Sequence, residues 1–278
     1  MHKDSYANTF IVAGALCLVC SLLVSGAAVI LKPIQDANVL NDRRMNILLA
    51  TGDFKREDLT VERINEIFET KIDDRIILLE TGEDVTDSLG DAEKVSKYDQ
   101  VKASKSNDDS LRLKLGSKED LAQIKNVELK AHVYIYTNDS GESFYIFPIR
   151  GKGLWSTLKG FIALKSDLRT IAGLTYYEHK ETPGLGGEVD NPTWKAKWTQ
   201  GKCICDETGK VRISVVTPES DPMFKVVSLS GATITSRGVE NMIKFWMGEY
   251  GFEKYIERVR AENASGSDNP SASQNGDD

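Results

Sequence analysis

The sequence predicts one membrane-spanning helix followed by a single α+β domain. Two observations predict this arrangement: an uncharged apolar run from Phe10 to Leu31, and strand-like runs after residue 126 that end in an amphipathic helix. The 278 residues are enough for a membrane segment and one sizeable core. We therefore expect five parts: a short segment 1–9, a transmembrane helix 10–31, a membrane-proximal helical and connecting region 32–125, an α+β domain 126–260 and a disordered acidic tail 261–278.

The apolar run from Phe10 to Leu31 is the strongest physical signal in the chain. As a helix its roughly 22 residues rise about 33 Å, which is enough to cross a bilayer. A cleaved signal peptide is the alternative, because the stretch Ser25-Gly26-Ala27 resembles a cleavage site. The apolar run continues past that stretch, so we favour a retained anchor. Lys3 precedes the run, and Lys32, Arg43 and Arg44 follow it. Charge therefore does not determine on which side of the membrane the domain lies.

The region between the anchor and the domain is expected to start with helices. An amphipathic stretch follows Pro33, and residues 58–70 carry a stripe of apolar side chains at helical spacing, formed by Leu59, Val61, Ile64, Ile67 and Phe68. Residues 80–118 are rich in Asp, Lys and Ser and are expected to form an exposed connection.

The domain itself is expected to be a sheet covered by a helix. Residues 129–137 and 143–149 are rich in β-branched and aromatic side chains and flank an Asn-Asp-Ser-Gly turn, which predicts a β-hairpin. Further strand-like runs cover residues 160–164, 171–177 and 211–216. A helix starting near Ser236 presents one apolar face for packing on the sheet, formed by Val239, Met242, Ile243, Trp246 and Tyr250.

Charge and cysteine content narrow the class of function. The formal net charge of -7, with an acidic C-terminal end that lacks Lys and Arg, argues against a nucleic-acid partner. The four cysteines form two local pairs, which does not indicate a disulfide framework. Cys203 and Cys205 are either half of a metal site or strand residues flanking a turn, and we expect the latter and no metal site.

The stretch SLSGATITSRG places four hydroxyl side chains, those of Ser230, Thr233, Thr235 and Ser236, at the expected start of a helix. Free N–H groups and the helix dipole favour a phosphate at such a position. The alternative is that Thr235 or Ser236 simply caps the helix, and spacing alone favours this capping role.

Two further loops have unusual composition. The stretch HKETPGLGGEV, residues 179–189, combines an acidic residue, a Thr-Pro turn and three glycines, so it either borders a flat polar ring or connects two strands. The stretch GKGLWS, residues 151–156, places Trp155 where it either flanks an aromatic ligand or fills the core. His179 is expected to be a surface residue and not a proton donor.

GKGLWS, ETPGLGGEV and SGATITS, in this order behind one membrane helix, resemble the C subunit of the sodium-translocating NADH:quinone reductase. The resemblance implies that the domain 126–260 binds FMN and that the FMN is covalently joined through a phosphoester bond to Thr233. It implies no catalytic acid or base. The cofactor-binding residues that it implies are Thr233, Ser230, Gly231, Ala232, Thr235, Glu181, Thr182, Leu185, Gly186, Trp155 and Ser156.

The resemblance also implies a place in a larger assembly. The chain would relay electrons between redox centres of partner subunits in a complex of the cell inner membrane, with its domain on the periplasmic side. That complex oxidises NADH, reduces ubiquinone and exports sodium. Sodium and quinone would be handled by the complex, and nothing in this sequence identifies a site for either. A flavin transferase that uses FAD would be a partner during maturation.

Two alternatives remain at this point. The G subunit of an Rnf-type ferredoxin:NAD oxidoreductase shares the anchor, the SGAT loop and a glycine-rich loop, and a non-redox periplasmic binding or scaffold domain would carry no flavin. One residue departs from the family's pattern: Val227 stands three positions before Ser230, where the flavinylation motif usually has an acidic residue.

Overall fold

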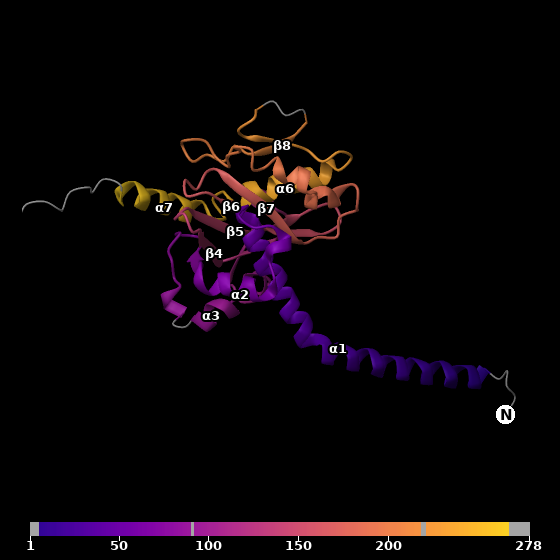
Figure 1. Ribbon diagram of the computed structural model, residues 1–278. Coiled ribbons are helices and arrows are strands. Elements are labelled where there is room, and N and C mark those ends of the chain that lie inside the picture. The colour runs from indigo at the N-terminus through magenta and orange to yellow at the C-terminus, as the bar shows by residue number, and fades with distance from the viewer. Residues whose placement is uncertain (1–5, 90–91, 218–220, 267–278) are drawn as a thin grey trace, which may run out of the picture. The chain divides into compact units, whose positions relative to one another are not determined.

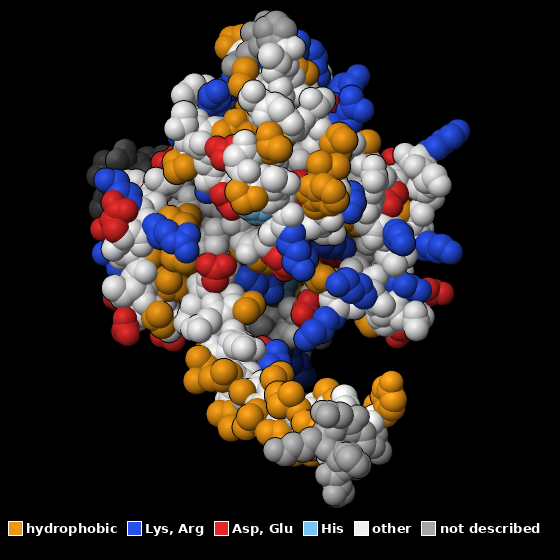
Figure 2. Space-filling model, turned by 90° about the vertical axis from the view of Figure 1, so that its right-hand side faces the viewer, with side chains coloured by type: hydrophobic (Ala, Val, Ile, Leu, Met, Phe, Trp, Pro, Cys, Tyr) orange, Lys and Arg blue, Asp and Glu red, His pale blue; other side chains and the backbone are white. Residues whose placement is uncertain are grey.

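The computed structural model describes residues 6–89, 92–217 and 221–266. It divides into two compact units, with the boundary between Arg43 and Arg44. The first unit is formed by most of helix α1 (Tyr6–Thr51), which continues through Pro33 without ending. Among the described residues, α1 is the helix long and apolar enough to cross a membrane. Hydrophobic side chains cover its surface in Figure 2, as expected of a helix that lipid surrounds.

The second unit is an α+β domain built on one antiparallel sheet, as predicted. Its five strands lie in the order β1-β4-β5-β6-β7, so four of them form a meander. Their bounds are β1 (Ile72–Leu78), β4 (Lys130–Thr137), β5 (Ser143–Lys152), β6 (Thr157–Leu164) and β7 (Ile171–Glu178). The predicted hairpin is confirmed, with Tyr134 opposite Ile146 and Thr137 opposite Ser143.

Both faces of this sheet are buried, because helices cover each of them (Figure 1). On one face the end of α1 and helix α2 (Val61–Thr70) pack against the strands through Leu48 and Ile64. On the other face lie α6 (Thr233–Trp246) and α7 (Glu253–Gly266). The predicted packing face of α6 is confirmed for Val239, Met242, Ile243 and Trp246, which are fully buried. Tyr250, predicted on the same face, lies beyond the end of α6 and is partly buried.

The strand β1 was not predicted. It pairs with β4 along its whole length, from Ile72 opposite Tyr136 to Leu78 opposite Lys130. Its first half, Ile-Asp-Asp-Arg, lacks the alternation of apolar and polar residues that marks a strand, because an edge strand can carry charges that face water. The domain's sheet therefore begins inside the range 32–125 that we expected to be helical and connecting.

Residues 80–118 are also more ordered than an exposed connection. They form η2 (Asp87–Leu89), α3 (Ala92–Lys97), α4 (Gln100–Lys105) and β2 (Arg112–Lys114), which pairs with β3 (Asn126–Glu128). Gln100 and Ser104 of α4 are buried. The expectation of full exposure was wrong for α4 because it contributes polar atoms to a buried network.

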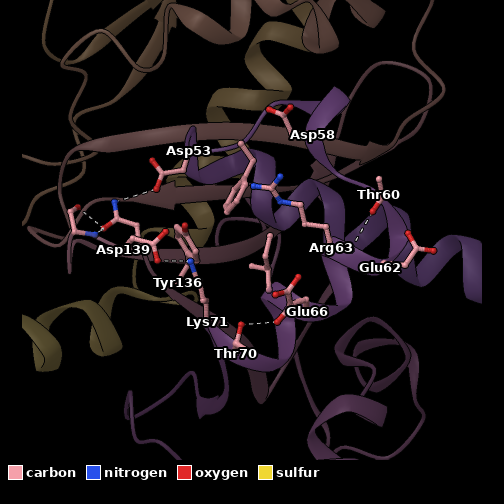
Figure 3. A pocket seen from close by; sticks show the side chains of 14 residues that line it. Asp53, Asp58, Thr60, Glu62, Arg63, Glu66, Thr70, Lys71, Tyr136 and Asp139 are labelled. Carbon is pink, nitrogen blue, oxygen red and sulfur yellow. Dashed lines mark hydrogen bonds and ion pairs between the residues drawn. The ribbon is translucent and has the colours of Figure 1, made fainter.

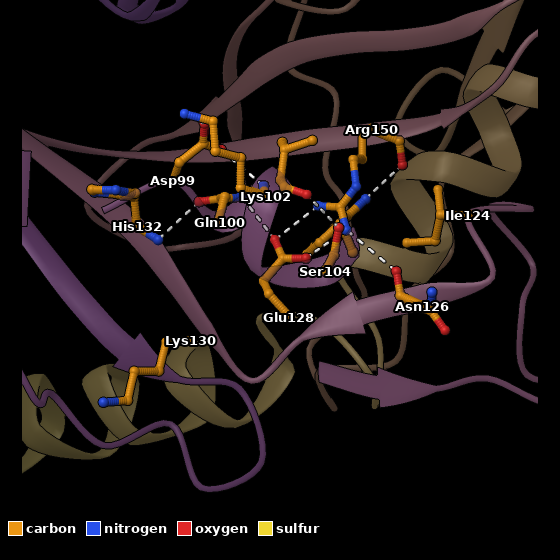
Figure 4. A network of polar contacts seen from close by, with 12 residues as sticks. Asp99, Gln100, Lys102, Ser104, Ile124, Asn126, Glu128, Lys130, His132 and Arg150 are labelled. Atoms are coloured by element: carbon orange, nitrogen blue, oxygen red, sulfur yellow. Dashed lines mark hydrogen bonds and ion pairs between the residues drawn. The ribbon is translucent and has the colours of Figure 1, made fainter. Parts of the chain in front are cut away.

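That buried network is centred on the ion pair between Glu128 and Arg150 (Figure 4). The two terminal guanidinium nitrogens of Arg150, Nη1 and Nη2, donate to the two carboxylate oxygens of Glu128. The side-chain amide of Gln100 donates to the same carboxylate. The Arg150 guanidinium lies 4.9 Å from the centre of the Trp246 ring, and the Trp246 indole N–H donates to the Arg150 carbonyl. The network thus joins α4, the sheet and the C-terminal end of α6.

Short elements complete the domain. They are η1 (Arg56–Asp58), η3 (Gly186–Asp190), α5 (Pro192–Ala196) and the parallel pair β8 (Ser214–Val216) and β9 (Lys225–Val227). Cys203 and Cys205 are buried and each takes part in an isolated β-bridge. Helix α7 continues to Gly266, six residues into the range 261–278 predicted to be disordered, and the rest of that range lies outside the described residues.

Candidate functional site

The three motifs singled out in the sequence meet around one buried carboxylate, that of Glu181. Its Oε1 accepts hydrogen bonds from the backbone N–H groups of Trp155 and Ser156, at 3.0 and 3.2 Å. Its Oε2 accepts from the N–H of Leu154, at 3.2 Å, and from the hydroxyl of Thr235, at 2.7 Å. We call the three segments the Trp155 loop (residues 153–156), the glycine-rich loop (181–187) and the Thr233 loop (228–233).

The Thr233 loop leads directly into α6. Thr233 is the first helical residue and is exposed, as is Ser230. The N–H groups of the first helical turn have no acceptor within the helix. The preceding residue, Ala232, has no side chain that could accept from them. The capping role considered for Thr235 and Ser236 was wrong: both are buried, Thr235 bonds Glu181, and the Ser236 hydroxyl accepts from the Leu229 N–H.

The glycine-rich loop is a tight turn held at both ends. The Thr182 carbonyl accepts from the N–H groups of Leu185 and Gly187, and Gly184 has a φ of 76°, in the left-handed region that favours glycine. His179 is partly buried, not a free surface residue, since its Nε2 lies 2.7 Å from the Asp190 carboxylate and its Nδ1 accepts from the Glu181 N–H.

The segments that meet at Glu181 carry exposed apolar side chains. Trp155 is 67% exposed, so the alternative that it fills the core is wrong. Leu154, Leu185 and Ile234 are also largely exposed, at 42, 45 and 59%. Leu185 lies against Gly231, because a Cβ built on Gly231 would come within 3.1 Å of its Cδ2. A flat apolar ring has suitable partners here, and the free N–H groups of α6 suit a phosphate.

Burial and hydrogen bonding shift the pKa of Glu181 in opposite directions. Burial alone raises the pKa of this carboxyl, but the bonds from Thr235, Trp155, Leu154 and Ser156 outweigh it, so its pKa lies below the ordinary value of 4.5. A carboxylate that accepts several hydrogen bonds therefore stays charged at neutral pH, although it is only 5% exposed.

A pH-dependent contribution to stability follows from this lowered pKa. The Glu181 carboxylate stabilises the fold fully above its ordinary pKa of 4.5, and this contribution is lost as pH falls through the lower folded value. We expect the difference in unfolding free energy between the wild-type chain and Glu181→Gln to narrow below about pH 4.5. Urea unfolding of the full chain in detergent at several pH values measures it. A difference that stays constant down to pH 3 would contradict this account.

A different part of the domain contains an open pocket of about 830 Å³, between α2 and the turn that joins β4 to β5 (Figure 3). Carboxylates and cations both line it, including Asp53, Glu66, Arg63 and Lys71. None of its lining residues belongs to the three loops. Because it lies apart from those loops, it is not the site that the three motifs indicate.

Two relatives resemble this chain over nearly its whole length. The C subunit of the Na(+)-translocating NADH-quinone reductase of Pseudomonas aeruginosa is 40% identical over 264 residues, covering 93% of this chain and 98% of the relative. The chain therefore belongs to the NqrC family, the C subunits of Na(+)-translocating NADH-quinone reductases. The NqrC protein of Yersinia pestis is 38% identical, covering 93% of this chain and 95% of the relative.

Solved structures and a family model agree with membership in the NqrC family. NqrC of Shewanella oneidensis is 31% identical, with a TM-score of 0.69 over 82% of this chain and 99% of that one. The corresponding protein of Parabacteroides distasonis is 27% identical, with a TM-score of 0.61, over 81% of this chain and 96% of that one. An FMN-binding domain model matches residues 153–248, which contain all three loops.

Contacts join several of the residues that the resemblance implied: Glu181 bonds Trp155, Ser156 and Thr235, and Leu185 lies against Gly231. Thr233, Ser230, Leu185 and Trp155 are exposed, while Glu181 and Thr235 are buried and bond each other. Sequence reasoning missed Gly153, Leu154 and Ile234. The exposure of Leu154 and Ile234 cannot be predicted from a linear sequence, whereas Gly153 stands in a motif that was already singled out.

Proposed function

We propose that this chain is the flavin-carrying subunit of a Na(+)-translocating NADH:quinone reductase, with FMN joined by a phosphoester bond to the Thr233 hydroxyl. The observation that carries the proposal is the exposed Thr233 at an uncapped helix start, inside the segment that matches an FMN-binding domain. Of the hydroxyls of Ser230, Thr233, Thr235 and Ser236, those of Thr235 and Ser236 are buried and form hydrogen bonds.

The residues present fit FMN. The first-turn N–H groups of α6 would hold the phosphate, and Trp155, Leu185 and Ile234 would contact the ring. When bound, FMN accepts electrons singly or in pairs, while the protein sets its position and potential. The residues of the chain keep the attachment point exposed and the apolar contacts around it in place. Electron transfer requires no acid or base from them.

Attachment is a group transfer catalysed by a partner, a flavin transferase that uses FAD. The Thr233 Oγ forms a bond to the phosphorus of the FMN half of FAD, and the P–O bond to the AMP half breaks. AMP leaves, and the hydroxyl proton is released. The exposure of Thr233 supports this step, because the transferase must reach its hydroxyl.

We place the chain in the cell inner membrane with its α+β domain on the periplasmic side. The apolar span of α1 supports single-pass anchoring. In this position the chain passes electrons between redox centres of other subunits, while those subunits oxidise NADH, reduce ubiquinone and move sodium. The relatives named above support this interpretation over the G subunit of an Rnf-type complex and over a scaffold domain without flavin.

The experiment that tests the function is coexpression of the full chain with a flavin transferase. We expect flavin fluorescence that survives denaturing electrophoresis, and a peptide containing Thr233 that is heavier by FMN less water. A colourless chain with an unmodified Thr233 peptide would leave the scaffold hypothesis standing. Genes for NADH-oxidising or ferredoxin-oxidising subunits beside this one would separate the quinone reductase from the Rnf-type complex.

Val227 provides a second test of the attachment motif. It lies in β9, opposite Val216 of β8, and its carbonyl accepts from the Trp194 indole N–H, so the backbone contact does not need the valine side chain. We expect Val227→Asp to speed flavin attachment, because a carboxylate adds a metal or hydrogen-bond partner for the transfer. Val216→Asp, on the paired strand, is the matched control. The idea fails if both variants are modified at the wild-type rate.

A further inference from the structure

The carboxylate of Glu181, in the glycine-rich loop, bonds both the Trp155 loop and Thr235 in the first turn of α6. We propose that Glu181 is a positioning residue that holds the flavin attachment point through Thr235, and that it is not itself a flavin ligand. This inference rests on the proposed function, because it concerns how the chain presents Thr233 to the transferase and then holds the attached flavin.

The hydrogen-bonding capacity of the Glu181 carboxylate is already filled by protein groups. A carboxylate offers about four lone-pair positions. Two are occupied on Oε1 by the Trp155 and Ser156 N–H groups, and two on Oε2 by the Leu154 N–H and the Thr235 hydroxyl. No acceptor position is left for a flavin N–H group or for the proton of Thr233. The role that remains for Glu181 is to hold protein groups in place.

Thr233 and Thr235 lie on opposite sides of the first turn of α6. Thr235 follows Thr233 by two residues on α6, which is about 200° around the helix axis, so their side chains point to opposite sides. Thr235 is 1% exposed and faces Glu181, while Thr233 is exposed. The bond between Thr235 and Glu181 therefore sets the rotation of the first helical turn and keeps the Thr233 hydroxyl turned outward.

Two glycines leave little space around the Glu181 carboxylate. A Cβ on Gly153 would lie 2.6 Å from Oε1 of Glu181. A Cβ on Gly186 would lie 2.6 Å from the Thr235 hydroxyl oxygen and 2.8 Å from Oε2 of Glu181. Glycines at these two positions let the Trp155 loop and the glycine-rich loop close onto the carboxylate. Trp155 and Leu185, the exposed apolar side chains, are carried by these same two loops.

The test uses the full chain, coexpressed or incubated with a flavin transferase and FAD. Glu181→Gln keeps the shape of the side chain but turns an NH₂ group toward N–H donors. Thr235→Val replaces the hydroxyl by a methyl group of similar size, whereas Thr235→Ser keeps the hydroxyl. Glu178→Gln, an exposed glutamate three residues earlier that pairs with Lys159, is the matched control.

Three readouts distinguish positioning from a general loss of structure. They are the rate of covalent attachment, the fluorescence anisotropy of the attached flavin, and hydrogen exchange of the amides in residues 154–156. We expect Glu181→Gln and Thr235→Val to slow attachment about tenfold or more, as loss of a hydrogen bond to a charged group implies, and to lower the anisotropy. Thr235→Ser should restore both, and Glu178→Gln should match the wild type. Exchange at 154–156 should rise in Glu181→Gln.

The outcomes separate the two proposals. If the wild-type chain takes flavin and both Glu181→Gln and Thr235→Val match its rate and anisotropy, Glu181 is not a positioning residue although the function stands. If the wild-type chain takes no covalent flavin, the function fails and this inference falls with it. If Glu181→Gln does not fold, the comparison of Thr235→Val with Thr235→Ser still decides, since equal behaviour of those two variants would overturn the role of the bond.

Discussion

Thr233→Val is expected to abolish covalent attachment of FMN. The phosphoester needs an oxygen that valine lacks, while the shape of the side chain is nearly kept. Thr233 is exposed at the start of α6, so the change should leave the fold intact. After coexpression with a flavin transferase, denaturing electrophoresis should show no flavin fluorescence in the band of this variant, and intact mass should match the unmodified chain.

A matched control for this variant is Thr193→Val. Thr193 is also an exposed threonine in the first turn of a helix, α5, but it lies outside the three loops. It should keep the full flavin content. Retention of covalent flavin by Thr233→Val would contradict the assignment of the acceptor and would move the site to another hydroxyl, with Ser230 as the exposed one in the same loop.

Arg150→Met is expected to destabilise the domain by about 3–5 kcal/mol, because it leaves the carboxylate of Glu128 buried without its partner. Glu128 is completely buried and Arg150 is 6% exposed, so neither charge can turn to water. Arg150 also stacks on Trp246, and its loss should loosen the C-terminal end of α6. Urea unfolding of the full chain in detergent measures the change in free energy.

The double variant Arg150→Met/Glu128→Gln should recover part of that loss, because it removes the uncompensated charge. The exposed pair Arg258 and Glu262 on α7 is the control: Arg258→Met should cost no more than about 1 kcal/mol, as is usual for surface ion pairs. Equal effects of Arg150→Met and Arg258→Met would show that the buried pair does not hold the domain together.

Elements whose sequence pattern spans only neighbouring residues were predicted correctly. The hairpin of β4 and β5 and the apolar face of α6 were both predicted, because turn residues and helical spacing are read from neighbouring positions. The edge strand β1 was missed because its pairing with β4 joins residues nearly 60 positions apart, as in Ile76 opposite His132. Non-local pairing leaves no periodic signal in a charged segment.

The site shows the same division. Thr233 was predicted as the acceptor from the motif and the resemblance, and the structure adds that its hydroxyl is exposed while that of Thr235 is not. Glu181 was expected to border the flavin. Its burial and its four donors came only from the fold, since they belong to residues 25 to 54 positions away along the chain.

The amino-acid sequence by itself determined the apolar anchor, the α+β class of the domain and the three motifs that mark the site, because each depends on composition or spacing within a few neighbouring residues. Tertiary structure alone decided which side chains of those motifs face water and which are buried. Tertiary structure also brings the Trp155 loop, the glycine-rich loop and the first turn of α6 together around the carboxylate of Glu181. These segments are far apart in the sequence, so only long-range packing specifies their contact. The Thr233 hydroxyl is exposed because Thr235 and Glu181 are bonded to each other on the buried side of α6.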